Sequence, residues 1–383
     1  MTAIPIAFFE NQLDEMLAEL RMLVEIESPS TDKAALDRMG AALVEQLRPL
    51  GAAIRVDHQS TAGDNIIASW QGTDGAMHGG FLIMCHFDTV HPVGMLAENP
   101  AQVQEGRLYG PGVIDMKGSI TQTLFALRAL REQGRWPQWP LTLLLTSDEE
   151  VGSEGSRPII EALGAQAELV LCMEPSLPDG ALKTARKGVA VYSVVTIGQA
   201  SHAGVDHADG INAIEEMAHQ VLAMQAFTDY ERGSTVSIGK ISGGTRPNVV
   251  PDECRAIVDI RVETSDEGDR LQDAMKALQS KLKGAKVVVT GGLERPPMPR
   301  TSEIDMAYRR AKVIGKGLGL EVREGSTGGG SDANLIAPLG LPILDGLGPL
   351  GSGAHTRKES LIVASLPPRT ALLTGILSEW SYH

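Results

Sequence analysis

The chain has 383 residues, 43% of them hydrophobic, which is enough to bury a large core and to form about two or three domains. Its formal net charge of -14 disfavours nucleic acids and anionic membranes as partners. No segment reaches the ~18 uninterrupted apolar residues of a membrane span, and the opening MTAIPIAFFENQLDEM lacks the basic start and cleavage site of a secretory leader. We therefore expect a cytoplasmic protein with no membrane partner.

Helical and strand patterns alternate through the first half of the chain. Apolar residues spaced three and four apart predict helices over 11–26 and 33–50. Short apolar runs predict strands at 53–56, 66–70 and 81–85, then a helix over 119–133 and strands at 141–146 and 168–173. This alternation is typical of an α/β domain with a parallel sheet.

The order of predicted helices and strands changes at Gly188. The pattern predicts a strand at 189–198, a helix over 212–224, strands at 234–241 and 254–262, a helix over 267–281 and a strand at 286–290. This order, βαββαβ, is that of a ferredoxin-like α+β domain. After the proline-rich ERPPMP the α/β pattern returns, with a helix over 302–318, a strand at 341–344 and a last helix over 367–382. We therefore predict a smaller domain, 188–296, inserted into a larger one formed by 1–187 and 297–383.

Polar residues follow the predicted strands at the points where the strands end. The run FLIMCHFD leads to His86 and Asp88, LTLLLTSDEE to the acids at 148–150, ELVLCMEP to Glu174, and LPILDGLGPLGSGAH to His355. Asp115 lies in the glycine-rich turn GPGVIDMKG before a helix. The carboxyl ends of parallel strands meet at one edge of a sheet, and a carboxylate-bridged two-metal hydrolase needs such a set of histidines and acids there.

Each of these residues also has an ordinary interpretation. Asp115 suits a helix N-cap as well as a ligand that bridges two cations. Glu149 and Glu150 could form a solvated acidic loop, or one could bind metal while the other acts as general base, because adjacent side chains diverge. His207 and Asp209 repeat the spacing of His86 and Asp88 without an apolar strand before them, so we interpret them as part of a solvated loop.

Two further features need an interpretation. The segment TGGGSDAN, at 327–334, lacks the lysine of a phosphate-binding loop. Its backbone N–H groups around Gly329 could approach a substrate carboxylate or a developing oxyanion, and a plain flexible loop is the alternative. Cys85, Cys172 and Cys254 lie in apolar runs without a CxxC pair, so we expect small core residues and neither a disulfide framework nor zinc thiolates.

With these residues in view, the chain resembles the dizinc aminoacylase and glutamate carboxypeptidase family of metallopeptidases along nearly its whole length. The motifs that carry the resemblance appear in the family's order: MCHFDTV, GPGVIDMKG, TSDEEVGSEGS, EPS, ASHAG, GGTRPNVVP, TGGGSDA and GSGAHTRKE. The resemblance implies a zinc-peptidase-type α/β/α catalytic domain over 1–187 and 297–383. It further implies that 188–296 is a ferredoxin-like lid and dimerisation domain.

The resemblance also implies a metal centre with two zinc ions per subunit, for which Co²⁺ or Mn²⁺ are possible substitutes. One ion would be bound by His86, Asp115 and Glu174, and the other by Asp115, Glu150 and His355. In the family the peptide bond after the bridging Asp is often cis, and here that bond would join Asp115 to Met116.

The resemblance assigns Glu149 as the general base and Asp88 as the acid that orients the His86 ring. His202, in ASHAG, would enter a neighbouring subunit's active site and stabilise the tetrahedral intermediate, which makes a homodimer the expected assembly; a hydrogen-bonded turn histidine is the alternative. Asn248, in RPNVVP, and Arg261, in DIRV, match positions that hold the substrate's free carboxylate, and arginine can do so with two hydrogen bonds.

Glu174 stands where dipeptidases and aminopeptidases of this family carry Asp, which favours the carboxypeptidases and deacylases. Within these, the chain most resembles the bacterial glutamate carboxypeptidases that act on folate-type substrates. Lys183, shortly after EPS, and Arg295, in ERP, match that group's additional basic contacts, and solvated surface charges are the alternative.

We therefore expect a zinc-dependent hydrolase that cleaves the amide bond of a peptidyl or N-acyl amino acid with a free carboxylate and releases C-terminal glutamate. The nearest alternative is a deacylase of small N-acyl metabolites of the acetylornithine or succinyl-diaminopimelate type. A non-catalytic binding protein on the same fold is more remote, because binding alone does not require the Glu149 base.

Overall fold

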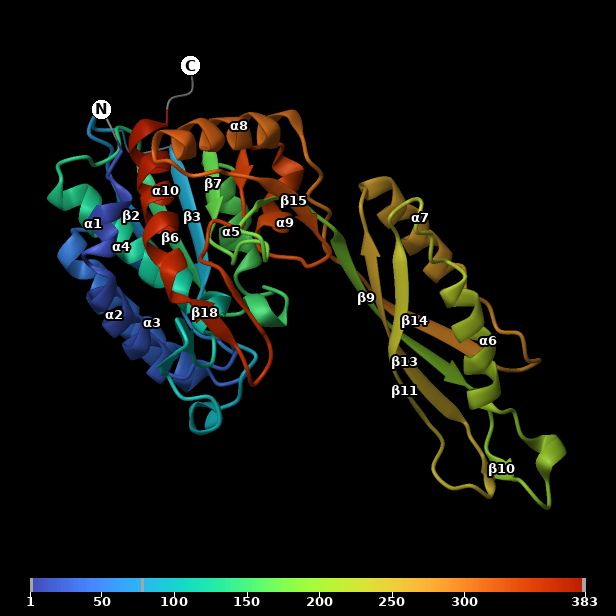
Figure 1. Cartoon of the computed structure of the whole chain (residues 1–383). Coiled ribbons are helices and arrows are strands. Elements are labelled where there is room, and N and C mark those ends of the chain that lie inside the picture. The colour runs from blue at the N-terminus through green and yellow to red at the C-terminus, as the bar shows by residue number, and fades with distance from the viewer. Residues whose placement is uncertain (1–2, 77–78, 381–383) are drawn as a thin grey trace. The chain divides into compact units, whose positions relative to one another are not determined.

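The computed structural model describes residues 3–76 and 79–380 (Figure 1). These residues form two compact units. Unit 1 consists of the described residues of Met1–Ala185, Arg300–Thr327 and Ser331–His383, and unit 2 consists of Arg186–Pro299 and Gly328–Gly330. The smaller unit is therefore an insertion into the larger one.

A six-stranded mixed sheet forms the centre of unit 1. Its strands, in spatial order, are β1 (Ala53–Asp57), β2 (Asn65–Trp70), β6 (Leu141–Thr146), β3 (Phe81–His86), β7 (Leu169–Cys172) and β16 (Ile343–Leu344). The pairs β6–β3, β3–β7 and β7–β16 are parallel. β3 and β7 are buried along their whole length, which explains why their sequences are continuous apolar runs.

The predicted parallel sheet is mixed, because one of its strands has the opposite direction. β2 is antiparallel to both β1 and β6. Only residues 58–64 join β1 to β2, and a parallel crossover needs a dozen or more residues, so the connection has to be a hairpin. The strands that end near the predicted site residues are β3, β6 and β7, and these are parallel to one another.

Helices cover both faces of this sheet. They are α1 (Ile6–Glu10), α2 (Leu13–Glu25), α3 (Lys33–Leu47), α4 (Gly118–Glu132), α5 (Arg157–Gly164), α8 (Ser302–Gly317), α9 (Ala333–Ile336) and α10 (Leu366–Glu379). Figure 1 shows α2, α3, α4 and α10 on one side and α5 with α9 on the other; α4 contacts α10, and α5 contacts α9. Buried residues such as Leu36, Leu127 and Leu373 pack against Ile83 and Leu143 of the sheet. The expected α/β/α fold class is confirmed.

Two smaller sheets in unit 1 bring distant segments together. One contains β17 (Gly351–Ser352), β18 (Ser360–Ile362), β5 (Arg107–Tyr109) and β4 (Val103–Gln104), in that order. The other pairs β8 (Leu182–Arg186) with β15 (Glu324–Thr327). Because β18 pairs with β5, the loop that contains His355 begins and ends beside the turn that contains Asp115.

Unit 2 is the expected α+β domain. Its four-stranded antiparallel sheet has the order β11 (Thr235–Gly243), β13 (Glu253–Val262), β9 (Gly188–Ile197) and β14 (Lys286–Arg295), and its helices are α6 (Ala213–Gln225) and α7 (Ser265–Lys276). Val194, Val258 and Ile260 pack with Met217 of α6 and Leu271 of α7 in one buried cluster. The short strands β10 (Ser201–His202) and β12 (Val249–Val250) pair outside this sheet.

Several element boundaries differ from those predicted. The first predicted helix, 11–26, corresponds to α2, and α1 precedes it without having been predicted. The helix α3 ends at Leu47 because Pro49 allows only a 3₁₀ turn before Gly51, which has a φ of 68°. α7 ends at Lys276 instead of 281, because the backbone N–H groups of Lys281 and Leu282 donate to the Glu216 carboxylate of α6. The last helix was expected to reach residue 382; α10 ends at Glu379, and 381–383 lie outside the described residues.

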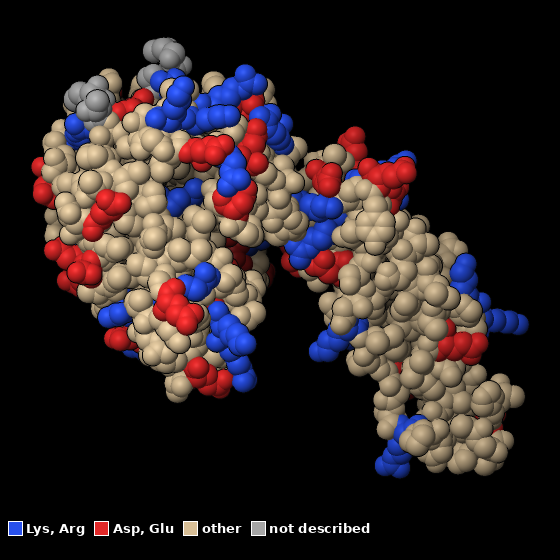
Figure 2. All heavy atoms as spheres, viewed as in Figure 1, with Lys and Arg blue, Asp and Glu red and all other residues tan. Residues whose placement is uncertain are grey.

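The surface carries both signs of charge. Figure 2 shows basic side chains gathered over α8. Within this helix, Arg309 pairs with Asp305 at 2.8 Å. Within the described residues, no helix combines the length and apolar character needed to cross a membrane.

Candidate metal centre

The ends of three neighbouring parallel strands position most of the candidate site. His86 is the last residue of β3, Glu149 and Glu150 lie in the turn after β6, and Glu174 follows β7 by two residues. Since β3 lies between β6 and β7 and is parallel to both, these side chains emerge at one edge of the sheet. Asp115 reaches the same place from the turn before α4.

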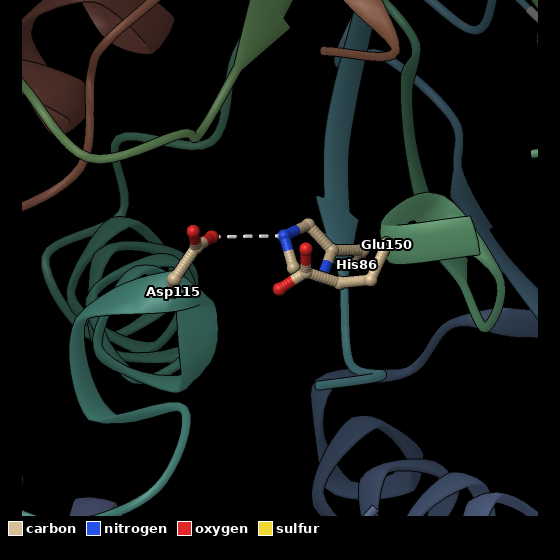
Figure 3. A group of neighbouring side chains, drawn as sticks. All are labelled: His86, Asp115 and Glu150. Atoms are coloured by element: carbon tan, nitrogen blue, oxygen red, sulfur yellow. Dashed lines mark hydrogen bonds and ion pairs between the residues drawn. The ribbon is translucent and has the colours of Figure 1, made fainter. Parts of the chain in front are cut away.

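Asp115 lies between two histidines. Figure 3 shows the contact between Asp115 and His86. The Oδ1 atom of Asp115 is 3.0 Å from Nε2 of His86, and its Oδ2 is 3.4 Å from Nε2 of His355. Glu174 Oε1 lies 3.5 Å from His86 Nε2, and Glu150 Oε2 lies 3.0 Å from His355 Nε2. The structure thus brings together all five predicted ligands, in two groups that share Asp115.

The donor set fits metal ions. His86, Asp115 and Glu150 offer ligand atoms that all lie within 4.8 Å of one another. Imidazole nitrogen and carboxylate oxygen are ordinary zinc ligands, and a carboxylate with one oxygen toward each group is suited to bridge two cations. The predicted cis peptide bond between Asp115 and Met116 is confirmed.

The charges of this cluster shift the titration of its histidines. Hydrogen bonds to Asp115 and then to Glu150 raise the pKa of His355 to about 11. Burial alone would lower the pKa of His86, but its contacts with Asp115, Asp88 and Glu174 outweigh burial and raise it well above the usual value. Burial and the neighbouring Asp115 raise the pKa of Glu150 despite its hydrogen bond to His355. Without metal, the neighbouring carboxylates therefore favour the protonated form of both histidines.

Asp88 contacts both the His86 ring and the backbone of the acidic turn at Glu149 and Glu150. The Nδ1 atom of His86 lies 3.1 Å from the backbone carbonyl oxygen of Asp88 and 3.4 Å from its Oδ1. The two carboxylate oxygens of Asp88 accept hydrogen bonds from the backbone N–H groups of Glu149 and Glu150, each at 3.1 Å, and from the Ser30 hydroxyl at 2.8 Å. Asp88 therefore fixes the acidic turn as well as contacting the ring.

The Glu149 side chain lines a small cavity with His86, Glu174, Cys172 and Asp332. Its neighbour Asp148, the third acid of the cluster, is used differently: its Oδ2 accepts hydrogen bonds from the backbone N–H groups of 155 and 156 and shapes the following turn. Cys85, Cys172 and Cys254 are buried, and no disulfide joins them.

Lys183 is buried rather than solvated, with an exposed fraction of 9%. Its backbone N–H donates to the Asp345 carbonyl, and its side chain packs along Gly346. Within 3–76 and 79–380, none of the hydrogen bonds or ion pairs involves its ammonium group, so this cation lies in the protein without an acceptor from those residues.

The remaining predicted site residues belong to unit 2. Asn248 is exposed, and so is His202, which accepts a hydrogen bond at Nδ1 from the backbone N–H of Gly204. Arg261 makes two hydrogen bonds to Asp259, of 2.8 and 2.9 Å, and a third to the carbonyl of Gly328, next to Gly329. Arg295, at the end of β14, is buried.

His207 and Asp209 lie in an exposed 3₁₀ turn of unit 2, as predicted. Sequence reasoning gave no role to three residues near the predicted ligands: Ser30, His91 and Glu359. Glu359 ends the motif GSGAHTRKE, which also contains His355, and His91 lies shortly after His86 in the sequence; these were the available signals.

Comparison with known proteins agrees with this geometry. The family model described as Peptidase family M20/M25/M40 matches residues 82–379. Carboxypeptidase G2 from Pseudomonas sp. (strain RS-16) is 32% identical, over 96% of this chain and 90% of that protein. A succinyl-diaminopimelate desuccinylase from Dechloromonas aromatica (strain RCB) is 31% identical, over 88% of this chain and 92% of that protein. The crystal structure of a tripeptidase from Staphylococcus aureus subsp. aureus mu50 shares the fold, with a TM-score of 0.79 at 22% identity over 96% of this chain and 98% of that one.

Proposed function

Because the chain belongs to peptidase family M20/M25/M40, we propose that it is a zinc-dependent hydrolase that cleaves the amide bond of a peptidyl or N-acyl amino acid with a free carboxylate and releases C-terminal glutamate. The observation that carries the proposal is the position of Asp115, with one carboxylate oxygen toward His86 and the other toward His355.

Five side chains would hold the two ions. His86, Asp115 and Glu174 would bind one zinc ion, and Asp115, Glu150 and His355 the other, with Co²⁺ or Mn²⁺ as substitutes. Enzymes of this family are typically dinuclear zinc hydrolases, which supports the assignment. When bound, zinc supplies Lewis acidity that polarises a carbonyl group and lowers the pKa of water.

Glu149 is the proposed general base. It takes a proton from the attacking water while the new C–O bond forms, and it returns the proton to the amine nitrogen as the C–N bond breaks. Its place in one cavity with His86 and Glu174 supports this role. Asp88 holds the backbone of Glu149 and Glu150, so that the base and the neighbouring ligand keep a fixed separation.

Unit 2 supplies the residues proposed to hold the substrate. Arg261 and Asn248 would hold the free carboxylate, and the backbone around Gly329 would approach it. The contact between Arg261 and the neighbouring Gly328 carbonyl supports a common role for these residues. His202 would act in the active site of a second subunit, with unit 2 serving as the lid and dimerisation domain of a homodimer.

The position of Lys183 supports the preference for glutamate. Most of this residue is buried, and a cation with little access to water gains from an accompanying anion such as a substrate side-chain carboxylate. Arg295 is the second proposed contact for that carboxylate. Carboxypeptidase G2, the 32% identical relative, is a carboxypeptidase by name, which agrees with cleavage next to a free carboxylate.

The second candidate is a deacylase of small N-acyl metabolites of the succinyl-diaminopimelate or acetylornithine type. The 31% identical desuccinylase favours it, since the same machinery would serve both reactions.

A substrate panel separates the two candidates. Zinc-loaded protein is incubated with dipeptides and N-acyl amino acids that differ only in the C-terminal residue, and the released amino acid is quantified. Preferential release of glutamate supports the carboxypeptidase, whereas preference for a basic or diamino acid supports the deacylase. Release of no amino acid from any substrate would contradict both.

A further inference from the structure

Glu359 is a buried carboxylate outside the proposed ligand set. Only 1% of it is exposed, and it ends the loop between β17 and β18 that contains His355. Its Oε1 accepts hydrogen bonds from the backbone N–H groups of Ile114 and Asp115, at 2.9 and 3.1 Å, and its Oε2 accepts one from Gly112 at 3.0 Å. The side chain therefore holds the Asp115 turn directly, including the N–H group of Asp115 itself.

His91 contacts the same carboxylate. Its Nε2 lies 2.6 Å from Oε2 of Glu359, and it is buried. His91 lies shortly after His86, the last residue of β3. One carboxylate thus joins three chain segments, and each of them provides a proposed ligand: His86, Asp115 or His355.

The Asp115 turn has the conformation that this contact requires. Gly112 has a φ of +69°, and a Cβ atom built there would lie 2.5 Å from Cγ2 of Thr89, so only glycine fits. Successive backbone N–H groups in such a turn form a concavity that binds an anion. In this protein the anion comes from the chain itself, through Glu359.

We propose that Glu359, held by His91, is a positioning residue for the metal centre: it fixes the backbone of Asp115 so that its carboxylate faces both His86 and His355. The inference rests on the proposed function, because it assigns Glu359 a role toward the proposed bridging ligand. A bridging carboxylate must keep one orientation toward two partners, and a hydrogen bond to its backbone restricts that orientation.

The position of His355 should also depend on Glu359. Its side chain is 55% exposed, and its φ of 63° lies in a region that residues other than glycine rarely adopt. Glu359 anchors the end of the loop that contains it. The ion bound by Asp115, Glu150 and His355 should therefore weaken more than the other ion when Glu359 is lost.

The test compares Glu359→Ala, Glu359→Gln and His91→Ala with the parent protein. Glu98→Ala is the matched control, because Glu98 forms an exposed ion pair with Arg357 of the same loop. Each metal-free protein is titrated with Zn²⁺ against a competing chelator, Co²⁺ absorption spectra report ligand geometry, and thermal unfolding of the metal-free proteins reports the fold.

We expect Glu359→Ala to bind the ion at Asp115, Glu150 and His355 about 10- to 100-fold less tightly, the range typical of residues that orient metal ligands. Glu359→Gln should recover part of this loss, because one oxygen can still accept from Ile114 and Asp115, and it remains informative if Glu359→Ala does not fold. His91→Ala should show a smaller loss with an altered Co²⁺ spectrum. Glu98→Ala should match the parent.

Variants that unfold more readily without metal but bind both ions with parental affinity and spectrum would overturn the inference, because Glu359 would then only stabilise the fold. The same parent titration separates this failure from failure of the proposed function. A parent protein that binds fewer than two ions contradicts the dinuclear centre itself.

Discussion

Metal binding should release protons from the two histidines of the centre. The pKa of His355 is raised to about 11 by Asp115 and Glu150, so at about pH 8 this residue is almost fully protonated in the metal-free protein. The pKa of His86 is raised well above the usual value although burial opposes the shift. A histidine must lose its proton at the coordinating nitrogen before it binds zinc. Filling both sites should therefore release about two protons, one from each histidine.

The expected pH dependence follows from that count. At pH values where His355 is protonated, zinc binding competes with that proton. For each proton released, the apparent zinc affinity should therefore increase about tenfold when the pH rises by one unit. The assay is isothermal titration calorimetry of metal-free protein with Zn²⁺ in two buffers of different ionisation enthalpy. The difference between the two measured enthalpies gives the number of protons released.

Two variants control this measurement. His355→Ala should release about one proton fewer than the parent. His58→Ala removes an exposed imidazole that contacts Asp64 at 2.6 Å, away from the centre, and should leave the proton count unchanged. A parental count near zero, or a count that His355→Ala does not lower, would refute the reasoning.

Further predictions concern the base, the bridge, the substrate contact and the metal-free protein. Glu149→Gln should keep both zinc ions yet lose about 10²- to 10⁴-fold in turnover, and near-parental turnover would remove Glu149 from the base role. Asp115→Ala should fail to hold two zinc ions by elemental analysis, so full stoichiometry would exclude it as the bridge. Lys183→Met should raise KM for glutamate-terminated substrates by about 10- to 100-fold while sparing neutral ones, and an equal effect on both would contradict the contact. Because the folded pKa of His355 exceeds its unfolded value, its contribution to the stability of metal-free protein is complete below about pH 6.5 and is lost toward about 11. Its half exposure moderates the effect. Melting temperatures of parent and His355→Ala should therefore converge as the pH rises, and a constant difference would contradict this.

The positions of the site residues at strand ends could be predicted from the sequence, because they depend only on where the strands end and on which strands are parallel neighbours. His86 ends β3 and Glu174 follows β7, whose apolar runs mark buried strands, and adjacent parallel strands bring their ends together. The cis bond after Asp115 came from the family resemblance. The apolar run that begins at Leu341 also indicated His355, although this residue lies well beyond β16, in the loop between the very short strands β17 and β18.

Other features depend on tertiary contacts that the pattern of residues does not record. Lys183 is an ordinary surface residue type, and only the packing around Gly346 buries it. Glu359 follows the polar segment HTRK, which favours a solvated loop, yet it is buried by its contacts with the Asp115 turn and His91. The reversed direction of β2 could have been predicted from the short connection to β1.

The most direct test of the metal centre is anomalous X-ray diffraction from crystals of zinc-loaded protein, with data recorded on both sides of the zinc absorption edge. The account predicts two peaks per chain, one in contact with His86 and Glu174 and the other with Glu150 and His355, with Asp115 in contact with both. A single peak, or two peaks that do not share Asp115, would contradict it.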